Sequence, residues 1–293
     1  MSKNIGVVFA FGPGELELQA WSLIRSLRHF GDFDEILAYT TTEEIGTVSE
    51  ALKTELETDC IIQSGPKPLD SYPISIKQAA LSRAASILDT DYLLCLDTDI
   101  LVLDGFDVPE CNSDLYLKPV DIGGQYYGSE QSYTEWRSLA ETFGMSFPGA
   151  TTKSTVDKKP IPPYWNAGMV LTRNNDFPDK WLSLTKALFE KHNTGYFTDQ
   201  VALGLLSTEY EVCEVGEQYN YPLTHRVFVP DSISILHYNT FYQLARIYDP
   251  RIFRKILKTD VFRGLEKDRD TAKSLAWQFL KAGRRRINHV SGY

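Results

Sequence analysis

The chain has 293 residues, of which 43% are hydrophobic and 24% are charged. These values are typical of a globular protein and exclude a disordered chain, a collagen-like repeat and a disulfide-rich miniprotein. No apolar stretch approaches the ~20 residues that a membrane-spanning helix needs, and the first residues lack the pattern of a signal peptide. The formal net charge of −9 argues against general nucleic-acid binding.

Charge is distributed unevenly along the chain. Residues 251–293 hold 12 Lys and Arg against 4 Asp and Glu, so an acidic body carries a basic C-terminal segment. We expect one α/β domain over residues 1–248 and a helical extension over residues 249–293. Basic, aromatic and apolar residues occur together around Trp277. The extension therefore either lies on an anionic membrane surface or packs on the body as a solvated helix.

The cysteines are widely scattered, and two of them lie in apolar, strand-like stretches. We expect all of them to be reduced, as is usual in the cytoplasm, and therefore expect a cytoplasmic location. They are Cys60, Cys95, Cys111 and Cys213.

The first half of the chain alternates between strand-like and helix-like patterns. Strand–helix–strand alternation is typical of an α/β protein with a mostly parallel sheet and helices on both faces. Ligands of such sheets bind at the carboxyl ends of the strands. The patterns predict strands over 5–11, 35–41, 60–62 and 92–96, and helices over 16–27, 43–57 and 76–88.

The second half is less regular. Residues 123–163 are rich in Gly, Ser, Thr, Tyr and Pro, and we expect loop on either side of one helix there. The patterns predict strands over 114–120, 165–172 and 233–238, and helices over 131–143, 178–191 and 198–206.

Two carboxylates follow the strand expected over 92–96. Asp97 and Asp99 flank one residue, and in an extended chain such residues point to the same side. Two carboxylates in that position repel each other unless a cation lies between them, and Mg²⁺ or Mn²⁺ fits such a site. The alternative is an ordinary turn at the end of a strand, where Asp is common.

Asn166, Ala167 and Gly168 precede the strand expected to run to residue 172. The amide of Asn166 offers both a donor and an acceptor to a hydroxylated ligand. Ala167 and Gly168 allow a ligand to approach the backbone closely. The alternative is a simple turn before a strand.

Two further motifs place polar groups beside apolar patterns. Asp199 and Gln200 stand at the start of the helix expected over 198–206, where they either face a site or only cap the helix. His237 ends an apolar stretch, and it is either a buried core residue or a metal ligand. A histidine ligand would favour Mn²⁺ over Mg²⁺.

These motifs, in this order, resemble those of the nucleotide-sugar glycosyltransferases of the GT-A fold. The nearest group is the retaining family 8 of glycogenin and the bacterial lipopolysaccharide galactosyltransferases, and the resemblance spans about residues 5–240. That family usually follows its histidine with a Gly-x-x-Lys-Pro-Trp stretch that contacts the diphosphate, which this chain lacks. A contact of this kind would then pass to Lys77, to Arg83 or to a C-terminal Arg.

The resemblance implies transfer of a hexosyl group from a nucleoside-diphosphate sugar, with a UDP-sugar favoured, to a saccharide or lipid-linked acceptor. It implies retention of anomeric configuration and a Mn²⁺ or Mg²⁺ ion held by Asp97, Asp99 and His237. The implied catalytic residues are Asp199, Gln200 and Asn166. The implied donor-binding residues are Ala10, Phe11, Gly12, Tyr39, Thr40, Lys77, Arg83, Asp97, Thr98, Ala167 and Gly168.

Aromatic side chains in the loop-rich segment either line the acceptor site or pack in the core. They are Tyr126, Tyr127, Tyr133, Trp136, Tyr164 and Trp165. The resemblance also leaves two other functions open. A sugar-phosphate nucleotidyltransferase shares the sheet and the acidic metal site but usually has a basic, Gly-rich loop, whereas Gly12 and Gly14 have no Lys or Arg beside them. A non-catalytic nucleotide- or sugar-binding protein is the third possibility.

Overall fold

The computed structural model describes residues 4–31, 33–123, 126–129, 132–147, 149, 151–173, 175–192, 195–224, 226, 228–244, 247, 251, 252, 255 and 256. Apart from these last four residues, the extension expected over 249–293, with its proposed membrane contact, lies outside the described residues. Within them, no helix has the length and apolar character needed to cross a bilayer.

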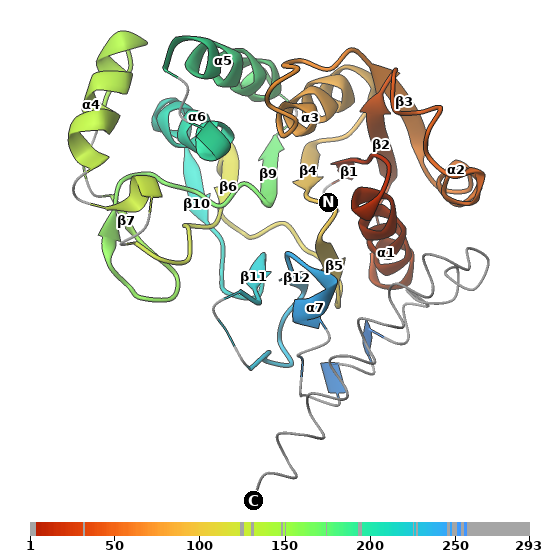
Figure 1. Ribbon diagram of the computed structural model, residues 1–293. Coiled ribbons are helices and arrows are strands. Elements are labelled where there is room, and N and C mark those ends of the chain that lie inside the picture. The colour runs from red at the N-terminus through yellow and green to blue at the C-terminus, as the bar shows by residue number, and fades with distance from the viewer. Residues whose placement is uncertain are drawn as a thin grey trace, which may run out of the picture.

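A seven-stranded, mostly parallel sheet forms the centre of the molecule (Figure 1), in the order β10-β6-β9-β4-β1-β2-β3. β9 runs antiparallel to both of its neighbours, and the other pairs are parallel. The strands are β1 (Ile5–Ala10), β2 (Glu35–Thr41), β3 (Ile61–Gly65), β4 (Tyr92–Leu96), β6 (Leu115–Leu117), β9 (Met169–Arg173) and β10 (Val212–Glu214).

Helices cover both faces of this sheet because successive strand side chains point to opposite faces. Val8 and Leu93 belong to a core that includes side chains of α3, α5 and α6. Their neighbours Val7 and Leu94 belong to a second core with α1 and α2. The helices are α1 (Glu15–Phe30), α2 (Glu50–Glu57), α3 (Ser75–Ile87), α4 (Tyr133–Thr142), α5 (Phe177–His192), α6 (Thr198–Leu206) and α7 (Phe241–Leu244). The expected α/β fold class is confirmed.

A small three-stranded sheet lies below the main sheet in Figure 1 and joins distant parts of the chain. It contains β11 (Tyr221–Pro222), β12 (Ile235–His237) and β5 (Ile100–Val102). A separate hairpin-like pair contains β7 (Thr152–Lys153) and β8 (Pro160–Ile161). Short 3₁₀ helices cover Tyr126–Gly128, Gly195–Phe197 and Ser207–Glu209.

The loop between β4 and β5 is held on both sides by backbone hydrogen bonds. The Asp97 N–H donates to the Gly168 carbonyl over 2.9 Å, and the Tyr238 N–H donates to the Asp99 carbonyl over 3.0 Å. Because β9 is antiparallel to β4, its amino end lies at the carboxyl end of β4. The small sheet brings His237 to the same edge, opposite Ile100. Three of the sequence motifs, those of Asp97 and Asp99, of Gly168 and of His237, are thus held next to one another.

Two elements start later than their patterns predict. The helix expected from residue 43 begins at Glu50, because the Ser49 hydroxyl accepts the Leu52 N–H over 3.2 Å and caps the helix there. The strand expected from residue 165 begins at Met169. The Gly168 N–H donates to the Asn166 side chain over 2.9 Å, so it is not available to a neighbouring strand.

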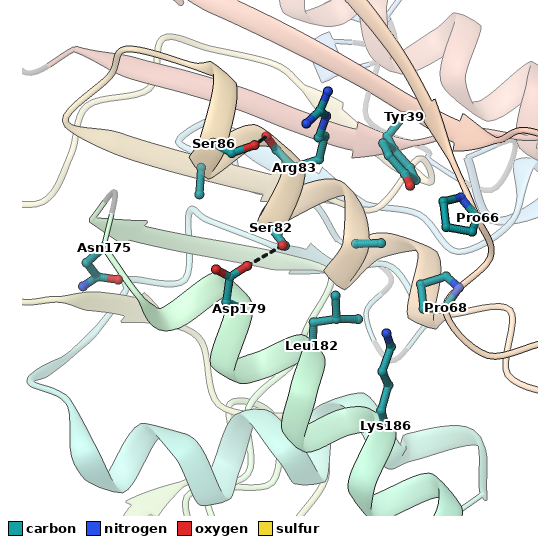
Figure 2. Close-up of a pocket in the computed structure, with 12 residues that line it drawn as sticks. Tyr39, Pro66, Pro68, Ser82, Arg83, Ser86, Asn175, Asp179, Leu182 and Lys186 are labelled. Carbon is teal, nitrogen blue, oxygen red and sulfur yellow. Dashed lines mark hydrogen bonds between the residues drawn. The ribbon is translucent and has the colours of Figure 1, made fainter.

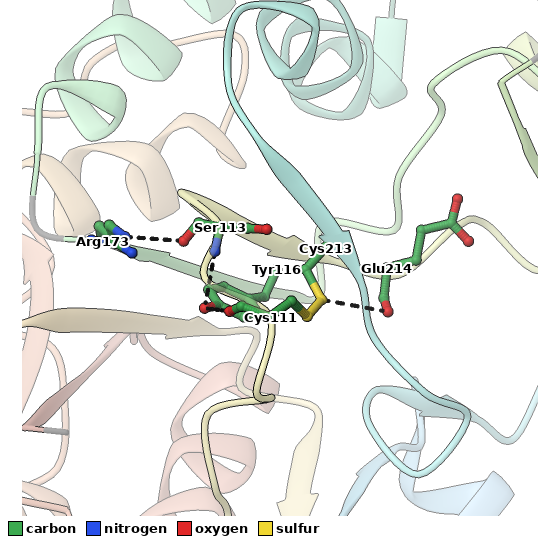
Figure 3. Close-up of a disulfide and its surroundings, with 6 residues drawn as sticks. All are labelled: Cys111, Ser113, Tyr116, Arg173, Cys213 and Glu214. Carbon is green, nitrogen blue, oxygen red and sulfur yellow. Dashed lines mark hydrogen bonds between the residues drawn. A yellow bond between two sulfur atoms is a disulfide. The ribbon is translucent and has the colours of Figure 1, made fainter. Parts of the chain in front are cut away.

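The expectation that all the cysteines are reduced is wrong for two of them. Cys111 and Cys213 form a disulfide, with Cα atoms 6.3 Å apart (Figure 3). Cys213 lies in β10, which pairs with β6, and Cys111 lies in the loop that leads into β6. Cys60 and Cys95 are free thiols. The cysteine-based argument for a cytoplasmic location therefore no longer applies, because disulfides persist mainly in oxidising compartments.

The large aromatic residues of the loop-rich segment pack in the core. Trp136, Tyr164 and Trp165 are all nearly inaccessible to solvent. The Trp136 indole N–H donates to the Tyr127 carbonyl over 2.7 Å, and the Trp165 indole N–H donates to the Ser207 hydroxyl over 2.8 Å. Of the two alternatives for these three residues, core packing is therefore correct, because their rings are buried and both indole N–H groups donate within the protein.

Candidate active site

A cavity of about 390 Å³ opens at the carboxyl ends of β1, β2 and β4. This is where ligands bind in open α/β sheets. The cavity gathers residues from seven regions far apart in the sequence. Its lining includes eight of the predicted site residues, namely Ala10, Phe11, Lys77, Asp97, Thr98, Asp99, Asp199 and Gln200.

Asp97 and Asp99, which line this cavity, form a cluster with His237, which does not line it. One ligand atom from each side chain can be chosen so that all three lie within 4.8 Å of one another. His237 Nε2 lies 3.3 Å from Asp99 Oδ1. Two carboxylates and an imidazole are a donor set that suits Mn²⁺.

The hydrogen bonds around His237 assign its protonated nitrogen. Asn220 Nδ2 donates to Asn166 Oδ1 over 3.2 Å, which leaves Asn220 Oδ1 as an acceptor. His237 Nδ1 lies 2.9 Å from that oxygen and therefore carries the proton that it donates. In the neutral ring, Nε2 then presents a lone pair to the Asp99 carboxylate. Two acceptors at this distance require a proton or a metal ion between them.

Gly168 leaves room for the His237 ring. A Cβ atom at position 168 would lie 2.5 Å from His237 Cε1 and 2.7 Å from Nδ1. Asn166 accepts hydrogen bonds from both Gly168 and Asn220, so it braces the residues that hold the histidine. Asn166 and Gly168 therefore lie next to His237, and none of the three lines the cavity.

Lys77 links the cluster of Asp97, Asp99 and His237 to α6. Its ammonium contacts Asp97 Oδ1 at 2.9 Å and Asp199 Oδ2 at 3.4 Å, and it donates to the Ala167 carbonyl over 3.0 Å. An ammonium group has three donors, so all three are in use. Lys77 is buried, and it links two carboxylates that would otherwise repel each other.

Asp199 and Gln200 differ in how their side chains are used. Asp199 Oδ1 accepts a hydrogen bond from the Tyr72 hydroxyl over 2.9 Å, and the Asp199 N–H donates to that hydroxyl over 3.0 Å. Both carboxylate oxygens of Asp199 are therefore paired inside the protein. Gln200 also lines the cavity, and its amide has no hydrogen-bond partner among the described residues. Of these two side chains, the amide of Gln200 is therefore the one that can contact a ligand.

Burial and charge shift the pKa values of these groups in opposite directions. Burial raises the pKa of Asp97, although the Lys77 ammonium works against it. Burial also tends to raise the pKa of Asp99, but His237, a backbone hydrogen bond and Lys77 together outweigh burial and lower that pKa. For Lys77, burial lowers the pKa, but Asp97 and Asp199 outweigh burial and raise it. At neutral pH the site thus keeps Lys77 charged between the buried Asp199 and the partly exposed Asp97.

Six predicted donor-binding residues do not line this cavity, namely Gly12, Tyr39, Thr40, Arg83, Ala167 and Gly168. Tyr39 and Arg83 line a different cavity of about 450 Å³, between α3 and α5 (Figure 2). Arg83 there donates two hydrogen bonds to Gln63. Thr40 is buried and does not line either cavity. Thr41, the next residue of β2, lines the 390 Å³ cavity instead.

Two predicted residues take part in other ways. Gly12 does not line the cavity, but a Cβ there would lie 3.5 Å from Glu44 Oε2, a residue that does. The Thr98 hydroxyl donates to Gln19 Oε1 over 3.0 Å, so it steadies the loop between the two aspartates.

Residues 7–211, about 70% of the chain, match the Rhodobacterales glycosyltransferase domain. The chain belongs to this family. Among solved structures, the fold is similar to that of galactosyltransferase LgtC in complex with donor and acceptor sugar analogues. The TM-score is 0.54 at 15% identity, covering 86% of this chain and 95% of that one. An active-site variant of LgtC gives a TM-score of 0.57 at 15% identity, over 87% and 94% of the two chains. No curated protein sequence matches the chain.

The chain is therefore a glycosyltransferase with a GT-A fold. Sequence motifs did not reveal every residue at the cavity of this glycosyltransferase. Tyr72 holds Asp199 but stands alone, 127 residues away in the sequence. Lys67 and Glu44 line the cavity from loops that carry no motif. Tyr196, which is 71% exposed, also lines it. In the sequence, the position of Tyr196 three residues before Asp199 is the feature that could have indicated its place at the cavity.

Proposed function

We propose that this glycosyltransferase transfers a hexosyl group from a nucleoside-diphosphate sugar to a saccharide or lipid-linked acceptor. A UDP-sugar is the favoured donor, and retention of anomeric configuration is the favoured outcome. The observation that carries the proposal is the cluster of Asp97, Asp99 and His237 beside Lys77 and Asp199. Asp97, Asp99, Lys77 and Asp199 line one cavity, and the chain belongs to a glycosyltransferase family.

A divalent cation, Mn²⁺ in preference to Mg²⁺, fits the residues present. Asp97, Asp99 and the lone pair of His237 Nε2 would hold it. When bound, it would stabilise the negative charge that develops on a leaving diphosphate. The Asn220 amide keeps the proton on Nδ1 and so keeps Nε2 available as a ligand atom.

Gln200 is our candidate for the group beside the anomeric carbon of the donor. Its amide lines the cavity without an internal partner, whereas both oxygens of Asp199 are paired with Tyr72 and Lys77. Asp199 then acts by holding Lys77 in place, and Lys77 in turn orients Asp97. An amide beside the anomeric carbon is compatible with attack by the acceptor from the face that the diphosphate leaves.

The base and ribose of the donor would occupy the part of the cavity formed by the ends of β1 and β2. Ala10, Phe11 and Thr41 line that region. Ala10 is small, so a base can approach the end of β1 closely there, whereas the ring of Phe11 is buried in the core. Lipid attachment of the acceptor stays a prediction from the basic C-terminal segment.

The test is the product formed from a panel of nucleotide sugars with simple saccharide acceptors. The proposal predicts a nucleoside diphosphate as product, formed only with Mn²⁺ or Mg²⁺ present. Asp99→Asn is expected to lower kcat/KM at least 100-fold, while the exposed control Asp107→Asn leaves it unchanged. Pyrophosphate as product would instead identify a nucleotidyltransferase. Nucleotide binding without turnover would identify a non-catalytic binding protein.

A further inference from the structure

A divalent cation alone does not neutralise the negative charges that meet in the cavity when a nucleotide sugar binds there. Four carboxylates line it, from Glu44, Asp97, Asp99 and Asp199, against two ammonium groups, from Lys67 and Lys77. A bound divalent cation would bring these charges into balance. The diphosphate of a nucleotide sugar then adds two negative charges, so a protein cation near it is needed to bind it well.

Two of the candidate cations are already committed elsewhere. The Lys77 ammonium uses its three donors on Asp97, Asp199 and the Ala167 carbonyl. Asp199 and Ala167 are buried, so releasing either of them would cost a hydrogen bond that solvent does not replace. Arg83 lines the other cavity (Figure 2), and its guanidinium is hydrogen-bonded to Gln63.

Lys67 differs from both residues, because its ammonium is not paired like that of Lys77 and it lines the same cavity as Asp97 and Asp99, unlike Arg83. It is half-buried, it lines the cavity that holds Asp97 and Asp99, and among the described residues it has no ion pair or hydrogen bond from its ammonium. Glu44 lines the same cavity, but the two side chains form no ion pair. The charge of Lys67 is therefore available to an incoming anion.

The backbone around Lys67 is held in place before any ligand binds. Pro66 and Pro68 flank it, and proline restricts both its own backbone and that of the residue before it. The Gly65 carbonyl, just upstream, accepts the Thr42 N–H over 2.9 Å. Pro66 and Pro68 face the other cavity (Figure 2), whereas Lys67 between them lines this one. Ordering Lys67 on a ligand therefore costs little backbone entropy.

We infer that Lys67 is the residue that binds the diphosphate of the donor. This inference rests on the proposed function, because it assumes a nucleoside-diphosphate donor and a divalent cation in the cavity. Lys67 contacts the diphosphate directly, without Lys77 or Arg83. Among the described residues that line the cavity, Lys67 carries an ammonium that no internal carboxylate pairs with, whereas Lys77 is paired with Asp97 and Asp199.

The experiment measures two affinities for the same set of variants. Binding of Mn²⁺ alone is followed by electron paramagnetic resonance. Binding of UDP in saturating Mn²⁺ is followed by calorimetry, with GDP, ADP, CDP and TDP tested in the same way to find the preferred base. The variants are Lys67→Met, which removes the charge, and Lys67→Arg, which keeps it. Lys186→Met is the matched control, because Lys186 is a half-buried cation of the other cavity.

Removing the Lys67 charge is expected to weaken nucleoside-diphosphate binding without weakening Mn²⁺ binding. Lys67→Met weakens nucleoside-diphosphate binding about 10- to 100-fold, the effect of losing one charged hydrogen bond. The same change leaves Mn²⁺ binding unchanged or makes it tighter, because one positive charge leaves an acidic cavity. Lys67→Arg stays within about 3-fold of the unmodified chain, and Lys186→Met changes neither affinity.

Three results would overturn the inference, and they are distinguishable. Unchanged nucleoside-diphosphate binding by Lys67→Met refutes the role of Lys67 and leaves the proposed function standing. Equal weakening of Mn²⁺ and nucleotide binding assigns Lys67 a purely structural role. Failure of the unmodified chain to bind any of the nucleoside diphosphates refutes the proposed function itself, and the inference with it.

Discussion

Replacing Gly168 by alanine tests whether the space beside His237 matters for metal binding. A Cβ at this position would lie 2.5 Å from His237 Cε1, 2.7 Å from its Nδ1 and 3.1 Å from Asn166 Oδ1. Ordinary carbon contacts are about 3.5–4.0 Å, so the ring must move by about 1 Å. Metal–ligand distances tolerate only about 0.2 Å of error. We therefore expect Gly168→Ala to remove His237 from the ligand set.

The expected loss is about 10- to 100-fold in Mn²⁺ affinity, the range seen when the support of a metal ligand is disturbed. Overpacking of the buried site adds a stability loss of about 1–3 kcal/mol. Mn²⁺ affinity is measured by electron paramagnetic resonance, and stability by chemical denaturation. Gly46→Ala is the matched control, because a Cβ at Gly46 would meet nothing within 4 Å.

A double-mutant cycle separates the metal effect from a general loss of packing. If the added methyl group acts through His237, then Gly168→Ala has no further effect on Mn²⁺ affinity once His237→Ala is present. Independent, additive losses would show that the two residues act separately. Wild-type Mn²⁺ affinity in a folded Gly168→Ala variant would refute the reasoning, because the ring would then not be a ligand in the observed position.

Three further predictions concern other parts of the molecule. Burial lowers the pKa of Lys118 from 10.5 to about 8, so the unfolded chain holds this proton to higher pH than the folded chain does. The free energy of unfolding is therefore expected to rise by about 3 kcal/mol between pH 8 and 10.5, and denaturation of Lys118→Met over that range is expected to lack this rise. Reducing the Cys111–Cys213 disulfide, whose cysteines are 102 residues apart, is expected to lower the free energy of unfolding by about 2–5 kcal/mol. An unchanged melting temperature with reductant would contradict this. Tyr72→Phe removes the hydroxyl that holds Asp199 and is expected to lower kcat/KM about 10- to 100-fold. A change of less than 2-fold in steady-state assays would exclude that positioning role.

The sequence predicts the sheet best where its strands are buried. The strand expected over 92–96 and the helix expected over 198–206 have the observed bounds, because a short apolar run and a helical apolar pattern leave little choice there. The carboxyl end of β4 was the predicted location of the site, and the cavity lies there. This follows from topology, because the loops of a parallel sheet meet at one edge.

Long-range pairing explains what the sequence could not predict. The residues of β10 and β6 do not themselves indicate that these two strands pair. The sequence therefore does not reveal that Cys213 lies beside Cys111, and it predicts reduced cysteines. The same applies to Tyr72, whose role depends on how the segment before α3 approaches α6. Tyr39 belongs to the predicted strand, but its side chain points to the α3 face and away from the cavity. Strand position alone does not say which face bears the ligand.

The most direct test of the account is thermal stabilisation by nucleoside diphosphates with and without Mn²⁺. At 100 times its Kd, a ligand adds about 2.7 kcal/mol of stability, which is readily measured. The account predicts a shift with one nucleoside diphosphate that requires Mn²⁺ and is lost in Asp99→Asn. A shift of the same size without metal, or in Asp99→Asn, would contradict a metal site built from Asp97, Asp99 and His237.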